Sequence, residues 1–79
     1  MERFLRIVYR IGNVEYIEDF VDEDAARVNA KYIINEVGCD YLIMKQVETD
    51  YVEFENVKII FEYNRFEEQI KWQKKNFKI

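Results

Sequence analysis

The stretch that decides the fold is residues 5–20, LRIVYRIGNVEYIEDF. Its apolar residues alternate with charged ones, and Gly12-Asn13 forms a two-residue loop that suits a tight hairpin because both residue types tolerate a positive φ. Pairing outward from this loop sets apolar residues opposite one another on one face and arginines opposite acids on the other. The expected pairs are Ile11 with Val14, Tyr9 with Tyr16, Leu5 with Phe20, Arg10 with Glu15 and Arg6 with Asp19. The sequence therefore predicts an N-terminal β-hairpin.

A helix is predicted directly after the hairpin. Asp22 has the side chain of an N-cap, Glu23 and Asp24 place negative charge at the positive end of the helix dipole, and Gly38 stands where a left-handed C-cap is expected. A second apolar stripe on this helix is expected to receive either the C-terminal helix or a partner. The core stripe is Ala26, Ala30, Ile33, Ile34 and Val37, and the second stripe is Ala25, Val28 and Tyr32.

Residues 40–63 predict antiparallel strands. The alternation of apolar residues slips at Glu55-Asn56, so we expect a tight turn or a bulge there, with Phe54 paired to Val57. A last helix is predicted from Arg65 to Phe77, with a core stripe of Phe66, Ile70 and Phe77. Residues 1–79 are thus expected to form a single small α+β domain with an N-terminal β-hairpin, a helix, a meander of antiparallel β-strands and a C-terminal helix.

The composition argues against catalysis. The chain has no His and one Cys, and it also has no Ser. Cys39 therefore lacks an imidazole base, and its neighbour Asp40 disfavours the thiolate, so we expect a buried structural thiol. A zinc site has too few ligands, and the acids of residues 22–24 are better assigned to a helix start. We expect no enzyme activity, no cofactor and no metal.

The cysteine content and the length of the apolar runs also predict the cellular location. A single cysteine favours a reducing compartment, and no apolar run is long enough to cross a bilayer. No signal-peptide pattern opens the sequence. We expect a soluble, cytoplasmic protein with no membrane partner.

Charge is distributed unevenly along the chain. Residues 1–64 hold seven basic and fourteen acidic groups, a net of −7, whereas residues 65–79 hold five basic and two acidic groups, a net of +3. In the predicted C-terminal helix, Trp72 and Ile79 lie away from the core stripe among Lys71 and Lys75, which is the make-up of an interface anchor. The alternative is that this segment is not one straight helix and that Trp72 covers the edge of the sheet. A second candidate contact surface is the acidic segment at the hairpin and helix start. Its members are Glu15, Glu18, Asp22, Glu23 and Asp24, with Asp19 between them.

These features predict a non-enzymatic module that binds a protein, as an inhibitor or modulator of a larger host protein. A short acidic chain rich in Lys, Glu, Asn, Ile and Tyr resembles the small accessory proteins of phages and mobile elements. Homodimerisation through the same aromatic surface is an alternative use of it. Two nucleic-acid alternatives stay open: direct binding by the basic C-terminal helix, which the acidic body disfavours, and mimicry of nucleic acid by the acidic segment. Direct binding would use Lys71, Lys74, Lys75 and Lys78 with Trp72 and Phe77 as stacking groups.

Overall fold

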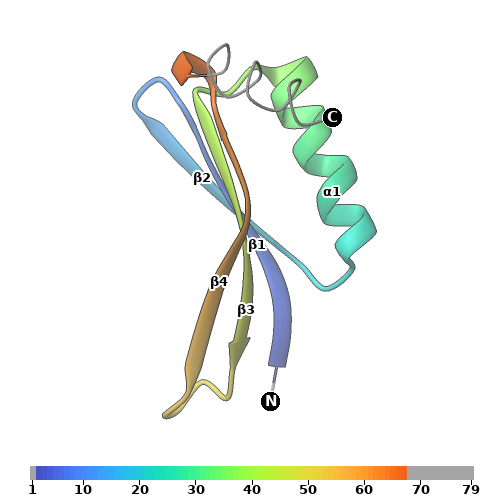
Figure 1. Cartoon of the computed structure of the whole chain (residues 1–79), viewed down its shortest axis with the longest axis vertical. Helices are drawn as coiled ribbons and strands as arrows, with labels where there is room; N and C mark the ends of the chain where they lie inside the picture. Colours follow the sequence, from blue (N-terminus) through green and yellow to red (C-terminus); the bar gives the residue numbers. More distant parts are fainter. Residues whose placement is uncertain (1, 68–79) are drawn as a thin grey trace, which may run out of the picture.

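The computed structural model describes residues 2–67, which form a twisted four-stranded antiparallel sheet with one helix along it (Figure 1). The strands are β1 (Glu2–Ile11), β2 (Val14–Phe20), β3 (Tyr41–Thr49) and β4 (Glu55–Asn64). The helix α1 (Glu23–Tyr32) continues into a π-helical turn η1 (Ile33–Val37), and a 3-10 turn η2 (Arg65–Glu67) follows β4. This arrangement confirms the α+β class.

The predicted hairpin is confirmed in its register. Strands β1 and β2 pair with Ile11 opposite Val14, and each of the other expected pairs is present. The rings of Tyr9 and Tyr16 stack with centroids 5.0 Å apart. Gly12 has a φ of 61°, as the tight loop requires. The pairing of residues that lie close together in the sequence is therefore enough to predict the register of β1 and β2.

The helix begins and ends as its capping residues predict. The Asp22 carboxylate accepts a hydrogen bond from the backbone N–H of Asp24, and Gly38 adopts a left-handed conformation with φ 84°. The last turn is wider than an α-helix, since the N–H of Gly38 donates to the carbonyl of Ile33 at 2.8 Å. Ala26, Ala30 and Ile33 are buried, so the predicted core stripe faces the sheet.

The predicted turn at Glu55-Asn56 is wrong. Residues 50–54 form the connection instead, and β4 runs unbroken through 55 and 56. The reason is Asp50, whose carboxylate Oδ1 accepts hydrogen bonds from three successive backbone N–H groups at 2.9 to 3.0 Å. This bonding folds the chain tightly and leaves Val52 and Phe54 in the loop, so the predicted pairing of Phe54 with Val57 is absent. Strands 41–49 and 55–64 therefore make one hairpin in place of the expected meander.

A bulge lies five residues beyond the predicted turn. Met44 pairs with Phe61 but Lys45 pairs with Ile59, which leaves Ile60 as an extra residue in β4. Because side chains alternate across a strand, this insertion places Val57 and Ile59 on one face of the sheet and Phe61 on the other. Apolar residues occupy the odd positions from 57 to 63, which suggests that they share one face of the sheet. The bulge instead divides them between the two faces.

The strand order is β2-β1-β3-β4, so β1 and β3 are central and β2 and β4 are the edges. The core lies between α1 and the sheet face that carries Leu5, Ile7, Leu42 and Met44. Val28 and Tyr32 of the second helix stripe are 68% and 57% exposed, so no element of the described range 2–67 packs closely on them.

The predicted C-terminal helix lies mostly outside the described residues. Its first residues, Arg65–Glu67, form a 3-10 turn, and Phe66 is 78% exposed. Placing Phe66 in a core stripe was therefore wrong. Ile60, Phe61 and Tyr63 pack against the core from within β4, whereas Phe66 lies beyond the end of the strand, in the 3-10 turn.

Candidate functional site

Helix α1 covers only part of its side of the sheet. Its principal contacts are with β1 and β2, while β4 lies at the far edge. Strands are about 4.8 Å apart and a helix with its side chains is about 10 Å wide, so one helix covers roughly two strands. Leu42 and Met44 of β3 are nevertheless 0% and 1% exposed, so in the described part of the chain the strip that stays partly open beside α1 lies over β4.

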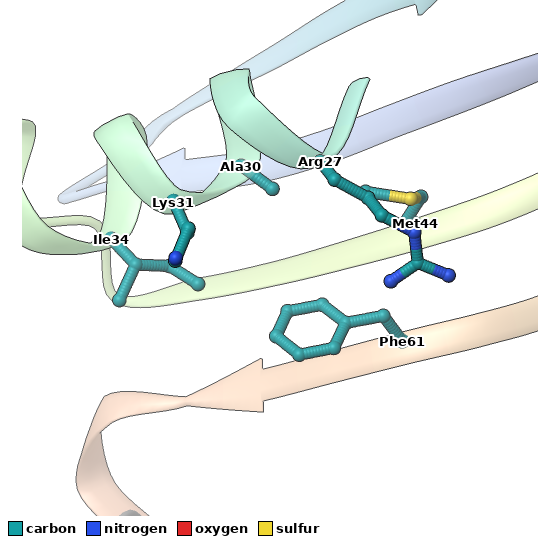
Figure 2. A pocket seen from close by; sticks show the side chains of 6 residues that line it. All are labelled: Arg27, Ala30, Lys31, Ile34, Met44 and Phe61. Carbon is teal, nitrogen blue, oxygen red and sulfur yellow. The ribbon is translucent and has the colours of Figure 1, made fainter. Parts of the chain in front are cut away.

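A groove of about 320 Å³ lies in this strip, between the helix and β4. Figure 2 shows its floor, where Met44 and the ring of Phe61 lie below the helix, and the two long side chains that reach down from α1. We call it the α1–β4 groove. Its lining residues are Arg27, Ala30, Lys31, Ile34, Met44 and Phe61, of which two are cations and none is an acid.

The cations of the α1–β4 groove are positioned by the helix. Arg27 and Lys31 are four residues apart, so they lie on one side of α1 about 6 Å from each other along its axis. The Nε of Arg27 donates to Glu23 Oε2 at 2.8 Å, one turn earlier. That bond leaves the two terminal nitrogens of the guanidinium for other acceptors, and Lys31 has no ion pair with any residue of the described range 2–67. The groove thus combines an apolar floor with a cationic rim, an arrangement suited to an apolar group that carries negative charge.

The predicted acidic surface is largely engaged within the molecule. On the hairpin, the Tyr41 hydroxyl donates to Glu15 at 2.7 Å, and Arg10 lies 3.6 Å from the same carboxylate. Arg6 donates two hydrogen bonds to Asp19, which hold the pKa of Asp19 below its usual range. These acids bind their cross-strand neighbours.

The acids near the helix have similar structural roles. Glu18 accepts a hydrogen bond from the Asn29 side chain at 3.3 Å, Asp22 caps α1, and Glu23 pairs with Arg27. Asp24 lies in the first turn of the helix. Five of the six acids therefore have a partner in the fold, which leaves less free negative charge than the sequence suggests.

The other face of the sheet carries a mixed surface. Register and alternation place Ile17, Val8 and Ile43 in one apolar row across three strands, and Phe4, Val47 and Val57 in another. Between these rows lie Asp19, Arg6 and Lys45. Charges interrupt the apolar area here, whereas the helix-side face presents the half-buried ring of Phe61 beside Met44.

Cys39 is a buried thiol, as predicted. It is 1% exposed and belongs to the core cluster between helix and sheet. Burial raises the pKa of the thiol, and the Asp40 carboxylate raises it further. Cys39 is thus held in its unreactive protonated form.

The predicted anchor formed by Trp72, Ile79, Lys71 and Lys75 lies outside the described residues, and so do the stacking groups of the nucleic-acid alternative. That anchor stays a prediction. The sequence analysis did not predict the α1–β4 groove. The four-residue spacing of Arg27 and Lys31 indicates that two cations share one side of the helix. The position of Phe61 on the helix side of β4 could not be predicted, because it depends on the strand order and on the bulge at Ile60.

Comparisons with protein-family models, with curated proteins and with solved structures found no match to this chain. Within residues 2–67, no helix is long and apolar enough to cross a membrane. The same range contains no group of three or more His, Cys, Asp or Glu residues that could hold a metal ion.

Proposed function

We propose that the chain is a protein-binding module without catalytic activity, an inhibitor or modulator of a larger protein. The α1–β4 groove is the contact surface in this proposal. The observation that carries it is the hollow between α1 and β4, where Phe61 is only partly buried next to its buried cross-strand partner Met44. An apolar floor rimmed by charge is typical of a protein-protein contact surface.

The composition supports binding over catalysis. A chain without His or Ser lacks the residues that most acid-base and nucleophilic mechanisms use. Cys39, the one thiol, is buried with a raised pKa. The resemblance in composition to accessory proteins of phages and mobile elements makes a host protein the partner class that we propose.

A capture experiment with surface variants tests this function. Tagged wild-type chain, Phe61→Asp and Ile17→Asp are used to capture partners from a lysate of the cells that express the gene or of their host. Ile17 is a matched control, since it is an exposed apolar residue on the opposite face of the same sheet. Urea denaturation of each variant verifies that the fold survives.

We expect wild type and Ile17→Asp to capture the same partner and Phe61→Asp to lose it. Equal capture by all three folded proteins would remove the groove from the proposal. Failure of the wild type to retain any protein would count against a binding module as such. Trp72→Ala, measured in parallel, tests the anchor predicted from the sequence.

A further inference from the structure

The connection between β3 and β4, residues 50–54, presents apolar side chains at one end of the sheet, beyond the lower end of α1 (Figure 1). We call it the β3–β4 loop. Val52 is 84% exposed, Tyr51 70% and Phe54 41%. Tight connections are ordinarily built from polar residues and glycine, because their side chains stay in water. Three large apolar side chains within five residues therefore form a local apolar patch on the surface.

Hydrogen bonds hold the β3–β4 loop in one conformation. The Asp50 carboxylate accepts three bonds from successive backbone N–H groups of the loop. The Thr49 hydroxyl accepts a bond from the N–H of Tyr51 at 2.9 Å and donates to the carbonyl of Phe54 at 2.8 Å. A loop that is already ordered loses little conformational entropy on binding, so its apolar side chains are presented in a form prepared for contact.

Tyr51 has an unfavourable backbone conformation. Among residues 2–67 it is the one residue other than glycine with a positive φ, at 65°. Glycine would adopt this conformation without strain, whereas a residue with a Cβ is destabilised by it. Strain of this kind is concentrated at binding and switch segments. A mostly exposed aromatic ring at a strained position contributes little to the core, so its role is better sought in recognition.

We propose that the β3–β4 loop inserts the side chains of Tyr51 and Val52 into an apolar pocket of a partner protein, and that lysine or arginine side chains line the rim of that pocket. The inference rests on the protein-binding function proposed above, but not on the α1–β4 groove. It assigns a second contact surface at a separate place on the molecule.

Charge selects the cationic rim. Residues 48–55 contain four acids and no base. Glu48 pairs with Arg3, and Asp50 binds the N–H groups of the loop. Neither Glu53 nor Glu55 forms an ion pair with a residue of the described range 2–67. These two carboxylates flank the apolar patch and are placed to meet positive charge on a partner.

The same charges disfavour two other occupants. The anionic headgroups of a membrane surface would repel the carboxylates beside the loop. A loop from a second copy of the chain would bring the same acids together. Both occupants are therefore treated as outcomes that would contradict the proposal.

Cyclodextrins with charged rims test the chemistry of the proposed pocket on the full-length protein. β-Cyclodextrin has an apolar cavity that admits an aromatic ring. One derivative carries an amine on each glucose unit, and the other carries a carboxylate at the same positions. Each is titrated at low and at high salt, while nuclear magnetic resonance follows the tyrosine rings. The protein variants are Tyr51→Ser and, as the matched control, Tyr32→Ser, which removes a tyrosine of α1 that is 57% exposed.

We expect the Tyr51 ring to bind the amine derivative at least about tenfold more tightly than the carboxylate derivative, with a ratio that decreases at high salt. The Tyr32 ring should show a smaller preference, although it experiences the same net charge of −4. Tyr51→Ser should remove the tight site and Tyr32→Ser should retain it. Equal binding of the two derivatives at Tyr51 overturns the proposal, and so does an equal preference at Tyr32.

Tyr51→Gly separates binding from folding. Glycine tolerates a φ of 65°, so this variant should keep or raise the urea midpoint of unfolding while it loses the tight cyclodextrin site. A large fall in the midpoint would show that Tyr51 holds the fold, which overturns the proposal. Binding of the wild type to vesicles of phosphatidylcholine and phosphatidylserine, or self-association in sedimentation equilibrium, also overturns it where Tyr51→Ser abolishes that behaviour.

The two proposals can fail separately in the capture experiment. If Phe61→Asp loses the captured partner and Tyr51→Ser retains it, the binding function stands and the loop is rejected as a contact surface. If Tyr51→Ser loses the partner and Phe61→Asp retains it, the groove is rejected and the loop stands.

Discussion

Met44 and Phe61 are direct partners across strands β3 and β4, yet only one of them is enclosed. Met44 is 1% exposed, because α1 and the neighbouring strands surround it, whereas Phe61 is at the edge of the helix and stays partly buried. This difference within one cross-strand pair marks the boundary between the core of the fold and the α1–β4 groove.

Truncation of this pair should therefore have unequal effects on stability. Met44→Ala leaves a cavity in a closed environment and should lower the free energy of unfolding by about 3 kcal/mol. Phe61→Ala should cost less, despite removing more atoms, because its ring already contacts solvent. Urea denaturation followed by circular dichroism measures both. A larger loss for Phe61→Ala would mean that Phe61 is a core residue and that the strip is closed.

The β3–β4 loop should depend on one carboxylate. Asp50→Ala removes the acceptor shared by the N–H groups of Val52, Glu53 and Phe54, so hydrogen exchange at these three amides should accelerate. Asp50→Asn keeps a side-chain carbonyl and should show a smaller acceleration. Unchanged exchange in Asp50→Ala would mean that the Thr49 hydroxyl bond to the Phe54 carbonyl holds the loop without Asp50.

The Arg6–Asp19 pair should give a small pH dependence of stability in acid. The Arg6 guanidinium, bonded to both carboxylate oxygens, lowers the pKa of Asp19 from its ordinary value of 3.8. A pKa that is lower in the folded than in the unfolded chain means that the pair stabilises the fold above about pH 4, and that this contribution is lost as pH falls through the folded pKa. Because both side chains are substantially exposed, the contribution should be at most about 1 kcal/mol.

The carboxyl titration of Asp19, followed by nuclear magnetic resonance, checks this assignment. Arg6→Gln should return the pKa of Asp19 towards its ordinary value, whereas Arg27→Gln, which breaks an exposed pair elsewhere, should not move it. An Asp19 titration that is the same in Arg6→Gln and in wild type would show that the two hydrogen bonds do not form in solution.

Cys39 should be protected from thiol reagents by the fold. Its pKa is raised first by burial and then by the Asp40 carboxylate, so the reactive thiolate is scarce and enclosed. Reaction with an aromatic disulfide reagent at pH 8 should be at least about 100-fold slower in the native protein than in concentrated urea. Asp40→Asn should change the native rate much less than unfolding does. A native thiol that reacts at the urea rate would contradict the buried position.

The parts of the fold that follow from local chemistry could be predicted from the sequence. The hairpin register comes from pairs such as Arg6 with Asp19, which lie close in sequence, and the helix ends come from Asp22 and Gly38. The β3–β4 connection could not be predicted in the same way, because the hydrogen bonds of Asp50 compete with strand pairing for residues 52–54.

The candidate site was less accessible to sequence analysis, because it depends on contacts between distant segments. Phe61 reaches the helix side only through the extra residue Ile60, and it borders a groove only because β4 is an edge strand. The acidic residues, which are conspicuous in the sequence, are mostly paired within the fold. A side chain's availability to a partner depends on its neighbours in space, which composition does not reveal.

The most direct test of the central claim is the methyl resonance of Met44 in full-length protein labelled with ¹³C at the methionine methyl groups. The sequence contains only one other methionine, Met1, so the signal is readily assigned. Addition of the partner protein that the wild-type chain captures should shift the Met44 resonance, and the same addition to Phe61→Asp should cause no shift. A Met44 resonance that stays unchanged when the partner is saturating would contradict the claim that the α1–β4 groove is the binding surface.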